Sequence, residues 1–377
     1  MSSLYLHIPF CRSKCPYCDF YSQVADESQL DDYIDLLDAE LQLQAGRRPA
    51  TEPLETIFFG GGTPSLLSER QVAQLLNRAN QQFGLARDCE ISLEANPGTL
   101  TGDTLKEYRS AGINRISLGV QALDNTQLEQ LGRGHTVEET RAAIAMIRQA
   151  GFDNLNLDLM FARPNLKTCD LESELTTLLS YGPEHVSLYG LSYEEGTEFF
   201  SRLQRGKLRE ADEALYREQY LLLHHKLTQA GFEHYEISNF ARPDRRCRHN
   251  MSYWQRRTCL AAGCGAHSFE QRDWGIRRAV PADLDRYRRC LKNHRSPAET
   301  LETFTRQQAM AETVYLALRT ADGLNYERFY QQFNQHPQQV FAAQIDRLAP
   351  HLLIHTDRWT FSIDSWLIYD HLISHFL

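Results

Sequence analysis

Three cysteines stand close together near the start of the chain. Cys11, Cys15 and Cys18 follow the spacing C-x3-C-x2-C, directly after the apolar run Leu4–Ile8. Thiolates at such short spacing hold iron-sulfur clusters or zinc. A structural zinc site is closed by four ligands, whereas a 4Fe-4S cluster held by three cysteines leaves one iron open to a further ligand. The spacing therefore predicts a metal centre on a loop that follows a strand.

Zinc is the alternative at this loop, with His7 as a fourth ligand in the pattern H-x3-C-x3-C-x2-C. A zinc site would account for the cysteines. However, zinc would not explain a set of polar residues further along the chain. These residues favour a cluster with a bound cofactor.

These polar residues end or follow apolar runs. Backbone amides and carbonyls are open to a ligand in a glycine-rich loop, because no side chain covers them there. For any one of these residues alone, a turn or a hydrogen bond at a strand end is the simpler interpretation. The set comprises the loop residues Gly61, Gly62 and Thr63, then Glu94, Gln121, Arg133 and Asp158.

Six short apolar runs, separated by amphipathic helical patterns, are typical of strands buried on both faces of a parallel sheet. Such alternation predicts either a partial (β/α)6 barrel or a doubly wound open sheet, with chemistry at the carboxyl ends of the strands. The runs are Leu4–Ile8, Thr56–Phe59, Glu90–Glu94, Arg115–Val120, Leu155–Met160 and Val186–Leu191.

The alternation stops near residue 240, and this predicts three parts. We expect residues 1–240 to form the barrel and residues 241–299, rich in Arg, Cys and Gly, to be irregular. A new helical pattern begins after Pro297, and the stretches Leu352–Ile363 and then Trp366–Phe376 indicate a small strand pair followed by a helix. Residues 300–377 are therefore predicted to be a small α+β domain.

Composition excludes several classes of protein. A hydrophobic content of 42% and a charged content of 24% are ordinary for a globular protein. The net charge of -9 argues against a nucleic-acid partner, which requires a basic face. No apolar run is long enough for a membrane span, and the first residues lack the pattern of a signal peptide. We therefore expect a cytoplasmic protein.

The cysteine loop and the polar set together resemble the radical S-adenosylmethionine superfamily, in its coproporphyrinogen dehydrogenase branch. The resemblance covers most of the chain and favours the partial barrel with a C-terminal domain like that of the dehydrogenases. It implies a 4Fe-4S cluster on Cys11, Cys15 and Cys18, and bound S-adenosylmethionine. The residues that it implies for cofactor binding are Tyr5, Tyr17, Gly61, Gly62, Thr63, Glu94, Gln121, Arg133, Asp158 and, within Ala261–Ser268, His267.

Two functions within this branch compete. The dehydrogenases carry a fourth cysteine two residues after the third, and this chain has Phe20 there. The phrase H-N-x-x-Y-W, from His249 to Trp254, resembles that of the haem chaperones related to these enzymes. This resemblance implies bound haem, an acceptor protein and a reductant for the cluster. Oxygen-independent coproporphyrinogen oxidation is the alternative, and we expect it to be absent.

His249 is the candidate haem ligand, and Cys247 could supply a thiolate instead. The residues alone also allow a structural role, in which His249 and Asn250 bond a loop to the barrel and Trp254 belongs to the core. A basic patch, Arg242–Arg257, is either a solvated surface or a partner for porphyrin propionates. One loop, Phe161–Lys167, departs from the Gly-Leu-Pro phrase of the relatives, so its role is open.

Overall fold

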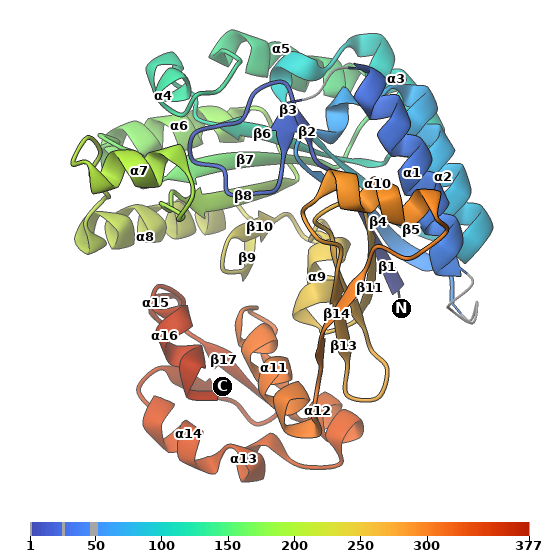
Figure 1. Ribbon diagram of the computed structural model, residues 1–377. Coiled ribbons are helices and arrows are strands. Elements are labelled where there is room, and N and C mark those ends of the chain that lie inside the picture. The colour runs from blue at the N-terminus through green and yellow to red at the C-terminus, as the bar shows by residue number, and fades with distance from the viewer. Residues whose placement is uncertain (1, 25–26, 46–51, 377) are drawn as a thin grey trace.

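The computed structural model describes residues 2–24, 27–45 and 52–376. Within these residues one sheet of twelve strands curves around the interior (Figure 1). Seven neighbouring strands, from β11 to β8, pair in parallel. In spatial order the strands are β14 (Glu299–Thr303), β13 (Ile276–Ala279), β12 (His267–Glu270), β11 (Thr258–Ala262), β1 (Ser2–Ile8), β4 (Leu54–Gly61), β5 (Leu85–Ala95), β6 (Arg115–Gln121), β7 (Leu155–Phe161), β8 (His185–Gly190), β10 (Asn239–Ala241) and β9 (Glu233–Glu236).

The six predicted apolar runs form β1, β4, β5, β6, β7 and β8, which lie side by side in that order. Burial explains why they are apolar throughout: in β7, Leu155, Leu157 and Leu159 are fully buried, and Met160 on the opposite face is only 6% exposed. The edge strands β14 and β9 do not pair with each other, so the barrel is partial. The predicted fold class is confirmed.

Helices cover the outer face of this sheet (Figure 1). A capping box at Thr136 and Glu139 begins one of them, and Gly112 ends another in the left-handed conformation. The helices of this part are α1 (Glu27–Ala45), α2 (Glu69–Phe83), α3 (Gly102–Ala111), α4 (Asn125–Gln130), α5 (Val137–Gln149), α6 (Thr168–Ser180), α7 (Glu198–Gln204), α8 (Glu213–Gln229), α9 (Arg248–Trp254) and α10 (Leu284–Lys292), with the short turns η1 (Pro64–Leu66) and η2 (Pro97–Thr99).

The stretch 241–299 is not irregular, contrary to our expectation. It contains α9, α10 and the strands β11, β12 and β13, and β11 pairs in parallel with β1 from Ser2↔Thr258 to Leu6↔Ala262. Buried Glu40 on α1 fixes the turn after β11, because it accepts hydrogen bonds from Gly263 N (2.8 Å) and from the Tyr287 hydroxyl (2.8 Å). Strand β1 thus lies between β4 and a strand from far along the chain.

The C-terminal part has its own apolar core, which includes Val314, Phe329, Trp359 and Trp366. The predicted strand pair is present, but the helix after it is broken into short pieces. The elements are α11 (Arg306–Leu318), β15 (Leu324–Asn325), α12 (Tyr326–Phe333), α13 (Pro337–Val340), α14 (Ala342–Leu348), β16 (Leu352–Ile354), β17 (Arg358–Phe361), α15 (Ile363–Trp366), α16 (Tyr369–Ile373) and η3 (Ser374–Phe376). The division of the chain into three parts stays a prediction.

None of the helices formed by residues 2–24, 27–45 and 52–376 is long and apolar enough to cross a membrane.

Candidate cofactor site

One cavity gathers most of the side chains that the sequence singles out. Its volume of about 390 Å³ is within the range of small-molecule sites. It lies at the carboxyl ends of β4 to β8, where Gly61, Glu94, Gln121, Asp158 and Tyr189 line it. The cysteine loop closes one side, and the lining residues predicted from the sequence are Cys11, Cys15, Cys18, Tyr17, Gly61, Gly62, Thr63, Glu94, Gln121, Arg133 and Asp158.

The cysteine loop is held by backbone contacts on both sides. Phe10–Cys11 (β2) pairs with Gln23–Val24 (β3), and Thr63 N donates to Phe10 O (2.7 Å), which ties the loop to the glycine-rich turn after β4. All three cysteines are half-buried and line the same cavity. Burial raises the pKa of the Cys18 thiol, and the negative charges of Cys15 and Cys11 raise it further. The three cysteines therefore face one common cavity.

Arg133 connects the cysteines to the floor of the cavity. One of its guanidinium nitrogens, Nη1, lies 3.5 Å from both Cys15 Sγ and Tyr17 Oη. The other, Nη2, donates to Asn96 Oδ1 and to Gly119 O (3.2 Å). Its Nε is buried without a partner among the described residues. A cation in this position favours thiolates on the cysteines and can pair with an anionic group of a ligand.

The glycine-rich loop brings bare backbone to the cavity. Gly61 has a φ of +112°, and a Cβ atom there would lie within 3 Å of the His7 ring. Its amide donates to Glu94 Oε2 (3.2 Å), so this loop also orients the carboxyl group. Glycine is therefore required at Gly61 by both its conformation and its neighbour.

Two carboxyl groups stand in the cavity with different partners. The pKa of Glu94 is raised to about 8, first by burial and second by the negative charge of Asp158. Burial also raises the pKa of Asp158, but hydrogen bonds from Asn156 and Ser187 and the charge of Arg115 act against this. Burial thus raises the pKa of both carboxyl groups, and Asp158 has more hydrogen-bond partners that favour its ionised form.

Tyr5 and His249 lie beneath this cavity, in a separate chamber of about 200 Å³ that we call the lower chamber. His249 is only 1% exposed, and both of its ring nitrogens are engaged: Nδ1 with Thr56 Oγ1 (2.8 Å) and Nε2 with Tyr253 Oη (2.9 Å). Burial lowers its pKa to about 3. In this conformation His249 is not open to haem iron, and it fixes α9 to the barrel instead.

Cys247, the second candidate haem ligand, is also closed off. It is fully buried, its thiol faces Glu90 Oε1 (3.7 Å), and burial raises its pKa to about 12. Glu90 further accepts from the backbone amides of Arg248 (3.2 Å) and His249 (3.1 Å). Glu90 therefore caps the N-terminus of α9, where the H-N-x-x-Y-W phrase begins, and holds it inside the barrel.

His267 and His7 lie away from the ligand set. His267 is exposed on β12 and does not line either cavity. His7 is 5% exposed, and its ring nitrogens meet Tyr5 Oη (3.0 Å) and Tyr21 O (3.1 Å). No three His, Cys, Asp or Glu side chains in the described part of the chain converge on one metal ion. The arrangement does not support zinc with His7 as its fourth ligand, whereas a cluster needs the three sulfurs on three different irons.

A buried ion pair stabilises the loop Phe161–Lys167. Arg163 Nη2 donates to Glu174 Oε1 (2.6 Å), and Glu174 Oε2 accepts from Leu123 N (2.9 Å). Gln219 Oε1 accepts from Ala162 N (2.8 Å). Arg163 and Glu174 are both buried. The departure from the Gly-Leu-Pro phrase thus has a structural role, since it ties the loop after β7 to α6 and α8.

The basic patch Arg242–Arg257 is largely taken up by contacts within the protein. Arg246 pairs with Glu233 (2.9 Å) and Asp322 (3.0 Å), and Arg256 pairs with Glu312 (2.6 Å). Arg242 lies 4.2 Å above the Phe232 ring. These contacts join the barrel to the C-terminal part and argue against a patch reserved for porphyrin propionates.

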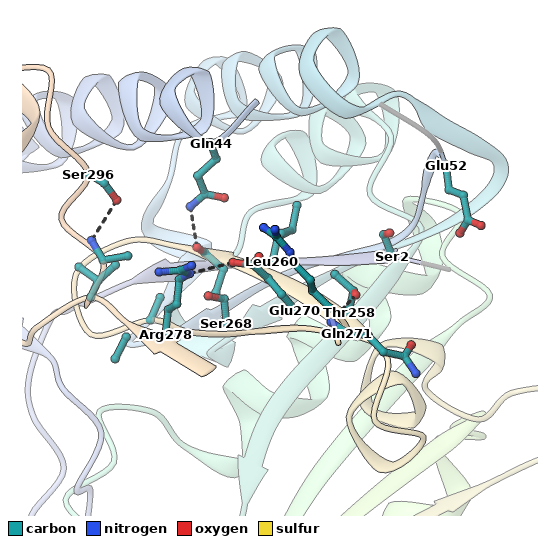
Figure 2. Close-up of a pocket in the computed structure, with 16 residues that line it drawn as sticks. Ser2, Gln44, Glu52, Thr258, Leu260, Ser268, Glu270, Gln271, Arg278 and Ser296 are labelled. Atoms are coloured by element: carbon teal, nitrogen blue, oxygen red, sulfur yellow. Dashed lines mark hydrogen bonds and ion pairs between the residues drawn. The ribbon is translucent and has the colours of Figure 1, made fainter. Parts of the chain in front are cut away.

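A larger cavity, of about 790 Å³, lies on the outer side of β11 to β13 beneath the end of α1 (Figure 2). Gln44 donates to Ala261 O (2.8 Å) across it, and Arg278 pairs with Glu270 (2.9 Å) at its edge. None of its lining residues belongs to the cysteine loop or the polar set. Size alone therefore does not locate the chemistry of this protein.

Comparison with known proteins decides the family. The model of the radical SAM superfamily matches residues 5–178, and that of the HemN C-terminal domain matches residues 304–357. The heme chaperone HemW of Bacillus subtilis is 33% identical over 94% of this chain and 93% of its own length. The chain belongs to the HemW family. The HemW of Escherichia coli is 40% identical over 70% of this chain and 69% of its own length.

The solved structure of coproporphyrinogen III oxidase (HemN) from Escherichia coli has the same fold, with a TM-score of 0.85 at 22% identity. It covers 100% of this chain, which covers 89% of it. Membership of the radical SAM superfamily implies a 4Fe-4S cluster and S-adenosylmethionine. The site described above fits both groups, because half-buried thiols, a partly unpartnered Arg133 and bare glycine backbone face one cavity.

Several lining residues have no counterpart in our sequence-based set. Asn96 joins the glycine-rich loop to Arg133, since its Nδ2 donates to Thr63 Oγ1 (3.1 Å). Ser117, Met160 and Tyr189 also line the cofactor cavity. Asn96 directly follows the strand that carries Glu94, and this position at a strand end was the signal that could have found it.

Proposed function

We propose that this chain is a haem chaperone, which binds haem and passes it to an acceptor protein. Cys11, Cys15 and Cys18 hold a 4Fe-4S cluster, and S-adenosylmethionine occupies the cavity above β4 to β8. The observation that carries the cofactor assignment is the convergence of all three cysteines, the glycine-rich loop and Arg133 on one cavity. The chaperone assignment rests on full-length similarity to relatives named heme chaperone HemW.

When bound, the reduced cluster supplies one electron to the sulfonium of the cofactor. The residues of this chain bind and orient it. Gly61 and Gly62 present backbone polar groups, Glu94 and Asp158 suit hydroxyl groups and positive charge, and Arg133 suits a carboxylate. Cytoplasmic location, a separate reductant and the roles of these residues are parts of this proposal.

Phe20 favours the chaperone over the dehydrogenase. It occupies the position of the dehydrogenases' fourth cysteine, and its side chain is 64% exposed at the edge of the cavity. A phenyl group can neither ligate iron nor transfer a proton. Coproporphyrinogen oxidation with release of carbon dioxide is therefore expected to be absent, even with dithionite and S-adenosylmethionine present.

Cluster binding is tested by anaerobic reconstitution, iron counting and electron paramagnetic resonance. Wild type should hold about four irons per chain, and Cys15→Ala should lose the cluster. Cys169→Ala is the matched control, because Cys169 is exposed on α6 and outside the cavity. An intact cluster in Cys15→Ala would contradict the ligand assignment.

Haem binding is tested separately, by titration followed at the Soret band. We expect saturable binding at one haem per chain and transfer to an apo-haem protein added afterwards. Carbon dioxide release from coproporphyrinogen without saturable haem binding would replace the chaperone assignment with the dehydrogenase.

A further inference from the structure

A layer of buried polar side chains lies beneath the cofactor cavity. Several residues line both this cavity and the lower chamber. The lower chamber and the cofactor cavity have Glu94, Ser117, Asp158 and Tyr189 in common. Below them lie side chains that the proposed function does not use: Arg115, Asn156, His185 and Tyr235. All four are at most 2% exposed, so the layer is sealed from bulk water.

A continuous chain of hydrogen bonds connects Asp158 with Cys247, the N-cap residue of α9. Asn156 Nδ2 donates to Asp158 Oδ1 (2.7 Å), and Asn156 Oδ1 lies 2.6 Å from His185 Nδ1. His185 Nε2 lies 2.8 Å from Tyr235 Oη, which accepts from Cys247 N (3.3 Å). The chain joins β7, β8, β9 and the N-cap of α9.

Each bond in this chain has one possible direction. The amide nitrogen of Asn156 faces Asp158 and donates to it, so the amide oxygen of Asn156 faces His185 and accepts. His185 then carries its proton on Nδ1, and its Nε2 accepts from the Tyr235 hydroxyl. Burial lowers the pKa of His185 well below its usual range, and the charge of Arg115 lowers it further, which agrees with a neutral ring.

Arg115 adds a positive charge to this layer. It is 2% exposed, lines the lower chamber, and its Nε has no hydrogen-bond partner within the described part of the chain. Its charge favours the ionised form of Asp158. Hydrogen bonds from Asn156 and Ser187 orient the Asp158 carboxylate, and the bonds behind Asn156 hold that amide in place.

We propose that His185 and Tyr235 are positioning residues, through which the helix of the H-N-x-x-Y-W phrase holds Asp158 in place for S-adenosylmethionine. The proposal rests on the proposed cofactor binding. The proposal gives α9, which carries buried His249, a role: this helix acts on the cofactor cavity from below. Trp254 at the other end of α9 meets Arg319 of the C-terminal part (4.5 Å), so α9 also contacts that part of the chain.

A double-mutant cycle tests the proposal on the full-length, cluster-loaded protein. The dissociation constant of S-adenosylmethionine is measured by isothermal titration calorimetry for wild type, Tyr235→Phe, Asp158→Asn and the double variant. Tyr235→Phe should weaken binding by about three- to tenfold, the effect of one buried hydrogen bond. In the Asp158→Asn background the same change should have no further effect, because the carboxylate that the chain orients is gone.

Tyr220→Phe is the matched control. Tyr220 is also buried, and its hydroxyl donates to Ile237 O (3.0 Å), outside both cavities. Its affinity for S-adenosylmethionine should equal that of wild type. Wild-type affinity in Tyr235→Phe, or an equal loss in both backgrounds, would overturn the proposal. Failure of wild type itself to bind S-adenosylmethionine would instead refute the proposed function.

A measurement on unmodified protein covers the case in which Tyr235→Phe does not fold. Nitrogen-15 labelling of histidine distinguishes the two neutral ring forms by nuclear magnetic resonance. His185 should show its proton on Nδ1 at neutral pH. A proton on Nε2 would reverse the chain of donors and refute the proposal.

Discussion

Binding of S-adenosylmethionine should release a proton from Glu94. In the free protein, burial raises the pKa of this carboxyl group to about 8, with Asp158 as the second cause. The cofactor brings a positive sulfonium and ribose hydroxyls that donate hydrogen bonds. Both stabilise the ionised carboxylate, so binding lowers the pKa of Glu94 and expels the proton.

The magnitude follows from the pKa. A group with a pKa of about 8 is roughly nine-tenths protonated at pH 7, half protonated at pH 8 and one-tenth protonated at pH 9. If the bound cofactor restores an ordinary carboxyl pKa, the protons released are about 0.9, 0.5 and 0.1 at these values. Affinity should therefore tighten by about tenfold per pH unit below pH 7, by about fivefold from pH 7 to pH 8, and by about twofold from pH 8 to pH 9.

Isothermal titration calorimetry in two buffers measures this release. Phosphate and Tris take up protons with different enthalpies, so the observed binding enthalpy differs between them in proportion to the protons released. The amino group of the cofactor titrates in the same range. Glu94→Gln cannot release the carboxyl proton, and it therefore reports the share of the amino group. Equal proton release in wild type and Glu94→Gln would refute the assignment.

Three further changes test other parts of the structure. His249→Ala should leave haem affinity within about threefold of wild type while lowering the free energy of unfolding by about 2 to 4 kcal/mol, because a buried, doubly bonded ring is lost. Glu174→Ala should lower the free energy of unfolding by about 3 to 5 kcal/mol in guanidinium denaturation, since it leaves Arg163 buried without its partner. Gly61→Ala should weaken S-adenosylmethionine binding at least tenfold in calorimetry, because the new Cβ strikes the His7 ring at a positive φ.

Each of these changes has a control in the same chain. Glu198→Ala removes an exposed pair with Arg202 and should cost no more than about 0.5 kcal/mol. Gly102→Ala places a Cβ in open space and should leave cofactor binding unchanged. Loss of the Soret change in a folded His249→Ala protein would restore His249 as the haem ligand.

The parallel strands could be predicted because burial leaves closely spaced apolar residues, as at Leu155, Leu157, Leu159 and Met160. Strand β11 escaped prediction for a physical reason. Its sequence, Thr258–Ala262, is short and carries small side chains, and its partner β1 lies more than 250 residues away in the chain. Such pairing depends on distant contacts that no local pattern records.

The cofactor site could likewise be predicted only in part from the sequence. Residues at strand ends, such as Glu94 and Asp158, could be predicted because parallel strands end at one edge. The resemblance to a family supplied the expectation that His249 binds haem, but both nitrogens of its ring are engaged inside the barrel. The simpler interpretation from the residues, a loop bonded to the barrel, matches the structure. Hydrogen-bond partners such as Thr56, on a distant strand, have no signature in sequence.

The pairing of β1 with β11 has a consequence for biosynthesis. The ribosome makes strand β1 and the cysteine loop before β11, which follows β1 after more than 250 residues. At about 5 to 20 residues per second, one edge of β1 stays unpaired for roughly 10 to 50 seconds. During that time the edge is open to pairing with other chains. Slow translation of the middle of the chain therefore prolongs the time for which this edge is exposed.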